Sequence, residues 1–280
     1  MSNRGEKSIL ITGCSSGIGY CVANGLKQRG YRVFATARRA ESVEKLGDEG
    51  FESLQLDLDD SASIKQAVDE TLQRTDGELY AVFNNGAFGL PGAVEDLSRE
   101  AIRAQFETNL FGWLELTNLL LPVMRTQGYG RIIQNSSVLG FVAMPFRGAY
   151  NASKYAIEGL SDTLRLELKD TDIHVSLVEP GPILSRFRAN ALQALQQHID
   201  IENSVHSERY QRVLERLTKE GPAAPFTLPP EAVLKAVIRA LESRKPRARY
   251  YVTFPTYLFG YLKRVLPVRT LDTILRQASN

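Results

Sequence analysis

The N-terminal part of the chain joins a short apolar segment, a glycine-rich loop and a helix, and this combination restricts the fold more than any other feature. Residues 8–12, Ser-Ile-Leu-Ile-Thr, have the character of a strand buried in a parallel sheet. The loop at residues 12–19, Thr-Gly-Cys-Ser-Ser-Gly-Ile-Gly, follows at once. Its glycines let the backbone approach a pyrophosphate, which the N–H groups of the next helix can bind. Such a string alone is often a tight turn, but between a strand and a helix it indicates a nucleotide site.

Strand and helix patterns alternate along the rest of the chain. Further strands are expected at residues 32–37, 53–56, 79–84, 131–136, 173–178 and 249–253. Helices are expected from the glycine loop to residue 30 and at 61–75, 98–127 with an interruption at 109–112, 149–169 and 230–243. This alternation predicts an α/β fold, a Rossmann-type doubly wound parallel sheet. The length of 280 residues fits one dinucleotide-binding domain, 1–280.

Two segments stand outside the alternation. Residues 185–228 read as a helical insertion that ends in Gly-Pro-Ala-Ala-Pro, with the place and length of a substrate lid. Residues 254–280 read as a C-terminal helical extension, in which apolar side chains recur at helical spacing with Lys263 and Arg264 between them. Such a stripe predicts packing on its own domain. Contact with a membrane surface is the alternative, because the stripe mixes aromatic and basic residues.

Composition and charge exclude several classes of protein. A net charge of +2, with no block of like charges, argues against a nucleic-acid partner. Cys14 and Cys21 are expected to stay reduced, the N-terminus has no apolar signal region, and no apolar run reaches the roughly 20 residues of a membrane span. We therefore expect a cytoplasmic protein. The three histidines show no metal-ligand spacing, so no metal site is assigned.

A tyrosine and a lysine are spaced for proton transfer in the helix expected at 149–169. Tyr150 and Lys154 stand four residues apart, which puts both side chains on one helix face. A phenol has a pKa of about 10, and a unit charge at roughly 4 Å in an effective dielectric of about 20 is worth about 4 kcal/mol, or roughly three pKa units. The lysine could therefore bring the tyrosine pKa toward neutrality. The pair alone is common by chance, but Ser137, after a predicted strand, and the glycine loop accompany it.

The end of the second predicted strand is where a dinucleotide fold selects its cofactor. A carboxylate there would bind a ribose 2′-hydroxyl, whereas this chain has Arg38 and Arg39. Two solvated surface arginines are the alternative interpretation. Because a guanidinium can pair with a 2′-phosphate that no carboxylate repels, NADP(H) is favoured over NAD(H).

Taken together, these motifs resemble those of the short-chain dehydrogenase/reductase family. The matches follow the family's order over nearly the whole chain: residues 12–19, Asn84 to Ala87, Asn109, Ser137, Tyr150 with Lys154, and Pro180-Gly181. Within the family the chain is similar to bacterial NADP-dependent aldehyde reductases and to hydroxysteroid and retinol dehydrogenases. The resemblance implies a homo-dimer or homo-tetramer formed through the helices near residues 112–126 and 150–168.

The resemblance also implies a role for each matching residue. Tyr150 would be the general acid of carbonyl reduction and the base of the reverse reaction, while Lys154 would hold the nicotinamide ribose and lower the tyrosine pKa. Ser137 would bond the substrate oxygen, and Asn109 would anchor a water that links Lys154 to solvent. Cofactor contacts are implied for Gly13, Ser16, Gly17, Ile18, Gly19, Asn84, Tyr150 and Lys154, with Ser15 and Arg38 at the 2′-phosphate, Asp57 and Leu58 at the adenine, and Pro180 and Ile183 at the nicotinamide.

The chain departs from the family pattern at two positions. The family usually has Asn-Asn-Ala-Gly where this chain has Asn-Asn-Gly86-Ala87. A backbone angle expected of glycine must therefore shift by one residue or be adopted by alanine. Ser185 replaces a threonine and keeps the hydroxyl. Neither change removes a catalytic group.

The segments that flank the predicted site are apolar, namely residues 88–91, 138–146 and the region after Pro182. They predict a hydrophobic small-molecule substrate, unless they only fill the core. We therefore predict an NADP(H)-dependent oxidoreductase that interconverts a hydrophobic aldehyde or ketone and its alcohol by hydride transfer. The alternative is a catalytically silent NADP-binding regulatory protein on the same fold. The intact Asn109, Ser137, Tyr150 and Lys154 argue against it.

Overall fold

The computed structural model describes residues 7–279, and seven strands form its centre. The strands are β1 (Ser8–Ile11), β2 (Arg32–Ala37), β3 (Glu52–Gln55), β4 (Ala81–Asn84), β5 (Gly130–Asn135), β6 (Ile173–Glu179) and β7 (Arg249–Tyr251). All neighbouring strands pair in parallel, in the order β3-β2-β1-β4-β5-β6-β7. This order reverses direction at β1 and β4, as the predicted doubly wound sheet requires.

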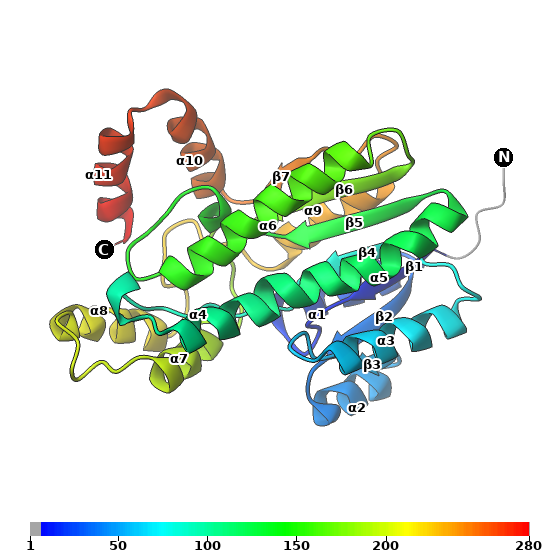
Figure 1. The fold of residues 1–280 in the computed structure, drawn as a ribbon, viewed down its shortest axis with the longest axis horizontal. Helices are drawn as coiled ribbons and strands as arrows, with labels where there is room; N and C mark the ends of the chain where they lie inside the picture. The colour runs from blue at the N-terminus through cyan, green and yellow to red at the C-terminus, as the bar shows by residue number, and fades with distance from the viewer. Residues whose placement is uncertain (1–6, 280) are drawn as a thin grey trace.

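Helices cover both faces of the sheet. They are α1 (Gly17–Gln28), α2 (Ala40–Asp48), α3 (Ser61–Arg74), α4 (Arg99–Phe106), α5 (Gly112–Gln127), α6 (Gly148–Glu167), α7 (Phe187–His198), α8 (Ser207–Thr218), α9 (Glu231–Glu242), α10 (Phe254–Val265) and α11 (Val268–Ser279). Short turns η1 (Val94–Asp96), η2 (Glu107–Phe111) and η3 (Val138–Gly140) complete the structure. Figure 1 shows α3, α5 and α6 across the near face, with α1 and α9 behind the sheet.

The alternation of side chains along β1 divides the core into two layers. Ile9 and Ile11 point to one face and pack in a cluster with residues of α1 and α9, including Val22 and Val237. Leu10 points to the other face and packs in a cluster with residues of α3 and α5. All three β1 side chains are fully buried. A strand buried on both faces explains why residues 8–12 read as a continuous apolar run.

Most elements lie within one or two residues of the sequence-based expectation, and the differences have local causes. The interruption expected at residues 109–112 is the π-helical turn η2, which lies between α4 and α5. The last strand, expected to reach Thr253, ends at Tyr251, because Thr253 already precedes α10 as its N-cap residue. Helix α2 was not predicted, since only Leu46 of its nine residues is buried and its apolar pattern is weak.

The segment expected to form a lid contains two helices, α7 and α8, and its ends lie together. Leu184 donates its N–H to the Leu228 carbonyl at 2.9 Å, and Leu228 donates to the Pro182 carbonyl at 3.1 Å. These bonds close the base of the 185–228 segment. In Figure 1 α7 and α8 lie at the same end of the molecule as α10 and α11.

The C-terminal stripe is oriented differently from the expectation that it packs on its own domain. Helix α10 buries Thr256, Phe259 and Gly260, whereas Tyr257 and Tyr261 are 57% and 65% exposed. Gly260 fits against the Tyr251 ring, where a Cβ would lie only 2.6 Å from a ring carbon. This close approach places the side of α10 with Thr256, Phe259 and Gly260 against the domain. The expectation is therefore wrong for most of the stripe. Within residues 7–279 no helix has the length and apolarity needed to traverse a bilayer. Residues 1–6, where the sequence shows no signal region, lie outside the described part of the chain.

Candidate active site

Three loops at the carboxyl edge of the sheet are joined by side-chain hydrogen bonds. The Thr12 hydroxyl, after β1, accepts the backbone N–H groups of Asn85 and Gly86, after β4, at 2.8 Å each. The Asn85 side-chain amide donates back to the Thr12 carbonyl at 2.9 Å. Asn135, at the end of β5, donates to Asn85 Oδ1 at 2.9 Å. This network fixes the edge on which ligands bind in open α/β sheets.

The glycine loop has the close contacts and the backbone angles that only glycine supports. Gly13 and Gly17 have φ values of +72° and +60°. A Cβ at Gly13 would lie 2.7 Å from the Gly86 Cα, and one at Gly19 would lie 2.2 Å from the Gly13 carbonyl oxygen. No side chain caps the N-terminus of α1, and its first turn carries no acidic residue. The loop residues therefore fit the predicted pyrophosphate cradle.

The predicted 2′-phosphate position is open and cationic. Arg38 is exposed just after β2, and within residues 7–279 its side chain forms no ion pair. The neighbouring Arg39 differs, because its guanidinium lies 3.5 Å from the Glu41 carboxylate. Ser15, in the glycine loop, is also exposed. The observed arrangement fits a phosphate on the ribose, which these two side chains would hold.

The remaining predicted cofactor residues line the same edge, with one difference. Leu58 is buried, and its Cδ1 would lie 3.1 Å from a Cβ placed on Gly86. The Oδ1 of Asp57 accepts the Asp59 N–H at 3.1 Å. Pro180 accepts the Val138 N–H at 2.9 Å through its carbonyl, and Ile183 pairs with Leu228. The Asn84 side chain instead points away and donates to the Thr117 hydroxyl of α5 at 3.1 Å. The Oδ1 of Asn84 has no hydrogen-bond partner among the described residues, so the predicted cofactor contact of this residue stays a prediction.

The glycine angle expected near the altered Asn-Asn-Gly-Ala motif is found at neither position. Neither Gly86 nor Ala87 has a positive φ, so the expectation of a shifted or alanine-borne angle is wrong. Gly86 is important here because it has no side chain: a Cβ at this position would lie 3.3 Å from the Thr12 hydroxyl. The small residue keeps the two loops in contact.

Tyr150 and Ser137 lie together at the centre of the site, where the Ser137 hydroxyl influences the Tyr150 phenol. Tyr150 lies in the first turn of α6, and Ser137 precedes η3, where its hydroxyl accepts the Leu139 N–H at 3.1 Å. Burial raises the pKa of Tyr150 to about 12, and the bond to Ser137 partly offsets this rise. The phenol therefore holds its proton at neutral pH.

Lys154 lies beneath the tyrosine ring and is fully enclosed. Its Nζ donates to the Asn135 carbonyl at 2.8 Å and lies 5.6 Å from the centre of the Tyr150 ring and 4.3 Å from the Trp113 ring. Burial lowers the pKa of Lys154 to about 7, although the Glu158 carboxylate one turn further along α6 raises it in part. The pKa of Tyr150 is raised by burial and partly lowered by Ser137, so the lowering of this pKa by Lys154 stays a prediction. The Lys154 amine faces the Asn135 carbonyl.

Asn109 lies in the π-helical turn and joins the β4 loop to α6. Its Nδ2 donates to the Phe88 carbonyl at 2.9 Å and to the Ser153 hydroxyl at 3.2 Å, while its Oδ1 accepts the Phe88 N–H at 3.1 Å. Both amide hydrogens are thus used by the protein. Only an oxygen lone pair of this side chain is left for the predicted water.

Apolar side chains enclose the site on two sides. One cluster joins Tyr150 to Val138, Leu139 and Val142 and to Phe259 and Leu275 of the C-terminal helices. On the other side, the Phe187 ring at the start of α7 packs edge-on against the Tyr150 ring, with 5.4 Å between ring centres. A Cβ on Gly89 would lie 2.6 Å from the Phe187 ring. The predicted lid thus begins directly over the predicted acid.

Four residues shape the site without having been predicted to do so: Thr12, Asn85, Trp113 and Asn135. The Trp113 indole donates to the Gly86 carbonyl at 2.7 Å, and its ring faces Lys154. Thr12 and Asn85 belong to motifs recognised in the sequence. A polar residue at the end of a predicted strand was the signal that could have identified them as site residues. Asn135, at the end of β5, carried the same signal and donates its side-chain amide to Asn85. Trp113 carried no such signal, because it acts through its indole N–H and its ring face.

The sequence is similar to those of several known proteins. A family model described as short chain dehydrogenase matches residues 7–196. The chain is 45% identical over 271 residues to the uncharacterized oxidoreductase YbbO of Escherichia coli, which covers 97% of this chain and 94% of that protein. It is 31% identical over 278 residues to retinol dehydrogenase 8 of Homo sapiens, with 96% and 85% covered. It is 30% identical over 274 residues to an NADPH-dependent 3-dehydrocapnine reductase of Ornithobacterium rhinotracheale, with 95% and 94% covered.

Proposed function

The chain belongs to the short-chain dehydrogenase/reductase family of oxidoreductases, and we propose that it reduces hydrophobic aldehydes or ketones with NADPH. The observation that carries this proposal is the position of Tyr150 and Ser137 beside an apolar cluster, with the Lys154 amine 5.6 Å from the centre of the Tyr150 ring. A bound nicotinamide would supply the hydride. The chain's own residues bind the carbonyl compound, orient its oxygen and deliver the proton.

The proton step follows from the pKa of Tyr150. A phenol that is protonated at neutral pH is ready to donate to a carbonyl oxygen, whose basicity rises as a hydride reaches its carbon. The Ser137 hydroxyl, which influences the phenol, would bond the same oxygen. Lys154 can return a proton toward the tyrosine, because a pKa of about 7 lets the amine exchange protons near neutrality.

The NADP(H) preference is supported by Arg38, which is exposed and forms no ion pair within residues 7–279, and by the relative from Ornithobacterium rhinotracheale, an NADPH-dependent reductase. The apolar substrate is supported by the clusters around Tyr150 and by Phe187 over its ring. We propose that residues 185–228 act as the lid, since the Leu184–Leu228 pairing closes its base. Cys14 and Cys21 are both free thiols, in keeping with the cytoplasmic location that we propose.

A homo-dimer or homo-tetramer is also proposed, through α5 and α6. Large apolar side chains of these helices and of the adjoining η2 turn are exposed, namely Phe111 (48%), Leu114 (38%), Tyr155 (40%), Leu160 (42%) and Leu166 (65%). The two helices lie side by side on the near face in Figure 1. A second copy packed there would cover these residues.

The function is tested by following NADPH absorbance with medium-chain aldehydes, retinal and steroid ketones. We expect wild type to reduce at least one of them and Tyr150→Phe to lose about 10²- to 10⁴-fold in kcat with NADPH binding kept. Ser137→Ala should lower kcat as well. NADPH binding without turnover of any carbonyl compound would favour the silent regulatory protein. Equal rates for wild type and Tyr150→Phe would remove Tyr150 from the mechanism.

A further inference from the structure

The outer side of α10 carries an apolar stripe that the described chain leaves largely exposed. Phe254, Tyr257, Leu258, Tyr261 and Val265 follow one another at helical spacing and are 55%, 57%, 38%, 65% and 53% exposed. Val268, at the start of α11, is 74% exposed. Phe226, at the end of the 185–228 segment, packs its ring against Phe254 at 4.9 Å. Seven of the fifteen large apolar side chains exposed by more than a third among the described residues thus gather in one region.

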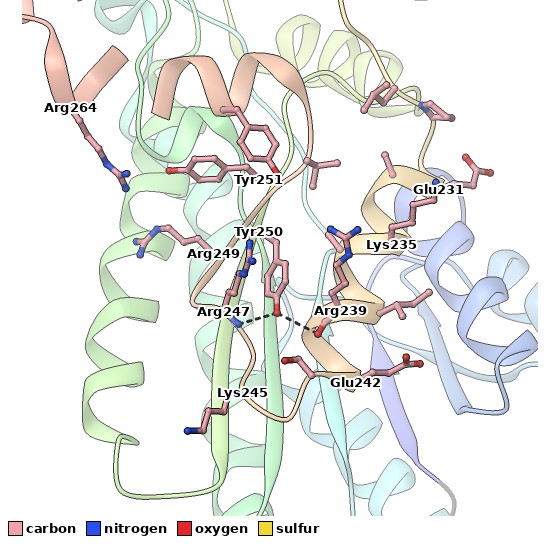
Figure 2. Close-up of a pocket in the computed structure, with 18 residues that line it drawn as sticks. Glu231, Lys235, Arg239, Glu242, Lys245, Arg247, Arg249, Tyr250, Tyr251 and Arg264 are labelled. Carbon is pink, nitrogen blue, oxygen red and sulfur yellow. Dashed lines mark hydrogen bonds between the residues drawn. The ribbon is translucent and has the colours of Figure 1, made fainter. Parts of the chain in front are cut away.

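A basic cleft of about 990 Å³ adjoins this stripe. Its walls come from α9, β7 and α10, and Tyr257 of the stripe lines it together with Arg264. Its other cations are Lys235, Arg239, Lys245, Arg247 and Arg249. Figure 2 shows Arg239 of α9 and Arg247 on either side of Tyr250, whose hydroxyl accepts the Arg247 N–H at 3.0 Å and donates to the Arg239 carbonyl at 3.4 Å.

The charge in the cleft is largely uncompensated. Of the six basic residues, only Arg249 is ion-paired, with its guanidinium 3.0 Å from Glu158, 2.7 Å from Asp162 and 3.0 Å from Glu179. The cleft has two carboxylates, Glu231 and Glu242, and Glu242 is paired with Arg29 at 2.8 Å. Within residues 7–279 the side chains of Lys235, Arg239, Lys245, Arg247 and Arg264 form no ion pair. These cations are scattered in the sequence and meet only in the fold.

We propose that the α10 stripe and the basic cleft together form a docking surface for an anionic lipid bilayer. The aromatic and aliphatic side chains of α10 would enter the boundary between headgroups and acyl chains, where tyrosine is favoured. Lipid phosphates would lie in the cleft against Lys235, Arg239 and Arg247. The positive charge of this surface favours an anionic bilayer over a second copy of the chain. A two-fold symmetric contact would bring the same unpaired cations against each other.

The docking surface also adjoins the site. The inner side of α10 packs through Phe259 in the cluster that contains Tyr150, while the outer side carries the stripe. The bilayer would therefore lie against α10, the helix that packs in the cluster around Tyr150. The proposal does not rest on the reaction, since exposure and charge alone carry it.

The test is flotation of the full chain with vesicles of phosphatidylcholine alone or mixed with phosphatidylglycerol. We expect binding to the anionic vesicles only, weakened by added salt. Tyr257→Ser with Tyr261→Ser should abolish binding, and Lys235→Glu with Arg239→Glu should lower it at least 10-fold. The matched controls are Val94→Ser, an exposed apolar residue in η1, and Lys45→Glu with Lys65→Glu on α2 and α3; these should bind as wild type does.

The single tryptophan, Trp113, is 2% exposed, so an unchanged emission spectrum reports that each variant is folded. No binding of folded wild type to anionic vesicles would overturn the proposal. So would equal binding by the stripe variant, or a stripe variant that only changes the oligomeric state. Soluble glycerol phosphate that binds the protein without any vesicle binding would show a small-anion site instead, and would also overturn it.

Discussion

The Nζ of Lys154 lies 2.8 Å from the Asn135 carbonyl oxygen, in a space where the lysine side chain is only 1% exposed. This contact satisfies one amine hydrogen but does not replace the lost hydration, so the pKa falls from 10.5 to about 7. A lysine held in this way can change its charge within the physiological range. The same residue would otherwise be a fixed cation.

Replacement of Lys154 by methionine tests this pKa through stability. The native pKa is below the unfolded one, so below about pH 7 wild type bears the full cost of a buried cation, and the cost disappears as pH rises to about 10.5. We expect Lys154→Met to gain stability relative to wild type, on the order of a few kcal/mol below pH 7, and the gain to shrink above it. Urea unfolding at several pH values measures the difference. A difference that stays constant from pH 6 to 10 would contradict the lowered pKa.

Replacement of Arg38 by alanine tests the cofactor preference. Because the free guanidinium would form a charge-assisted bond to the 2′-phosphate, we expect NADPH affinity to fall about 10- to 100-fold and NADH affinity to change little. Arg39→Ala is the matched control, since Arg39 faces Glu41. Fluorescence titration with each dinucleotide gives both affinities. Equal losses for the two would show that Arg38 does not read the phosphate.

The sequence predicted the sheet and its helices well because the central strands are buried on both faces. β1 and β2 read as continuous apolar runs, and the glycine loop fixes the turn between β1 and α1. The residue types of the site were equally readable, since Ser137, Tyr150 and Lys154 do meet at the sheet edge.

The directions of side chains could not be read in the same way. Asn84 and Asn85 are identical in type, yet one binds Thr117 and the other joins the loops after β1 and β5. The outward stripe of α10 was also missed, because that helix is apolar on both sides and only the fit of Gly260 to Tyr251 decides which side is buried. Both outcomes depend on contacts between elements far apart in sequence.

Removal of the Phe187 ring tests the lid contact. Phe187 covers the Tyr150 ring, so an apolar substrate must bind beside it or displace it. We expect Phe187→Ala to raise KM for long-chain aldehydes about 10-fold, by the loss of buried apolar contact, with a smaller effect on short aldehydes. Val205→Ala, also in the lid but 82% exposed, is the control and should behave as wild type. An equal KM change for long and short aldehydes would argue against a substrate contact.

Glu179 and Glu158 form a buried acid pair behind the site, and Glu179 offers a second test by pH. Glu179 is fully buried at the end of β6, and its burial together with the Glu158 charge raises its pKa to about 9, although Arg249 lowers it in part. A carboxyl whose native pKa exceeds the unfolded value stabilises the fold below about pH 4.5, and this contribution is lost as pH rises to about 9. The glutamine of Glu179→Gln does not titrate, so this variant lacks that pH-dependent contribution to stability.

We therefore expect the stability of Glu179→Gln relative to wild type to increase steadily between pH 5 and 9, as measured by urea unfolding. Asp162→Asn is the matched control, since Asp162 contacts the same Arg249 at 2.7 Å but has a lowered pKa. Its stabilising effect is lost only as pH falls through its native pKa, which lies below 3.8. Its difference from wild type should therefore be flat between pH 5 and 9. Parallel curves for wild type and Glu179→Gln would mean that Glu179 is already ionised at pH 5, held in that form by Arg249.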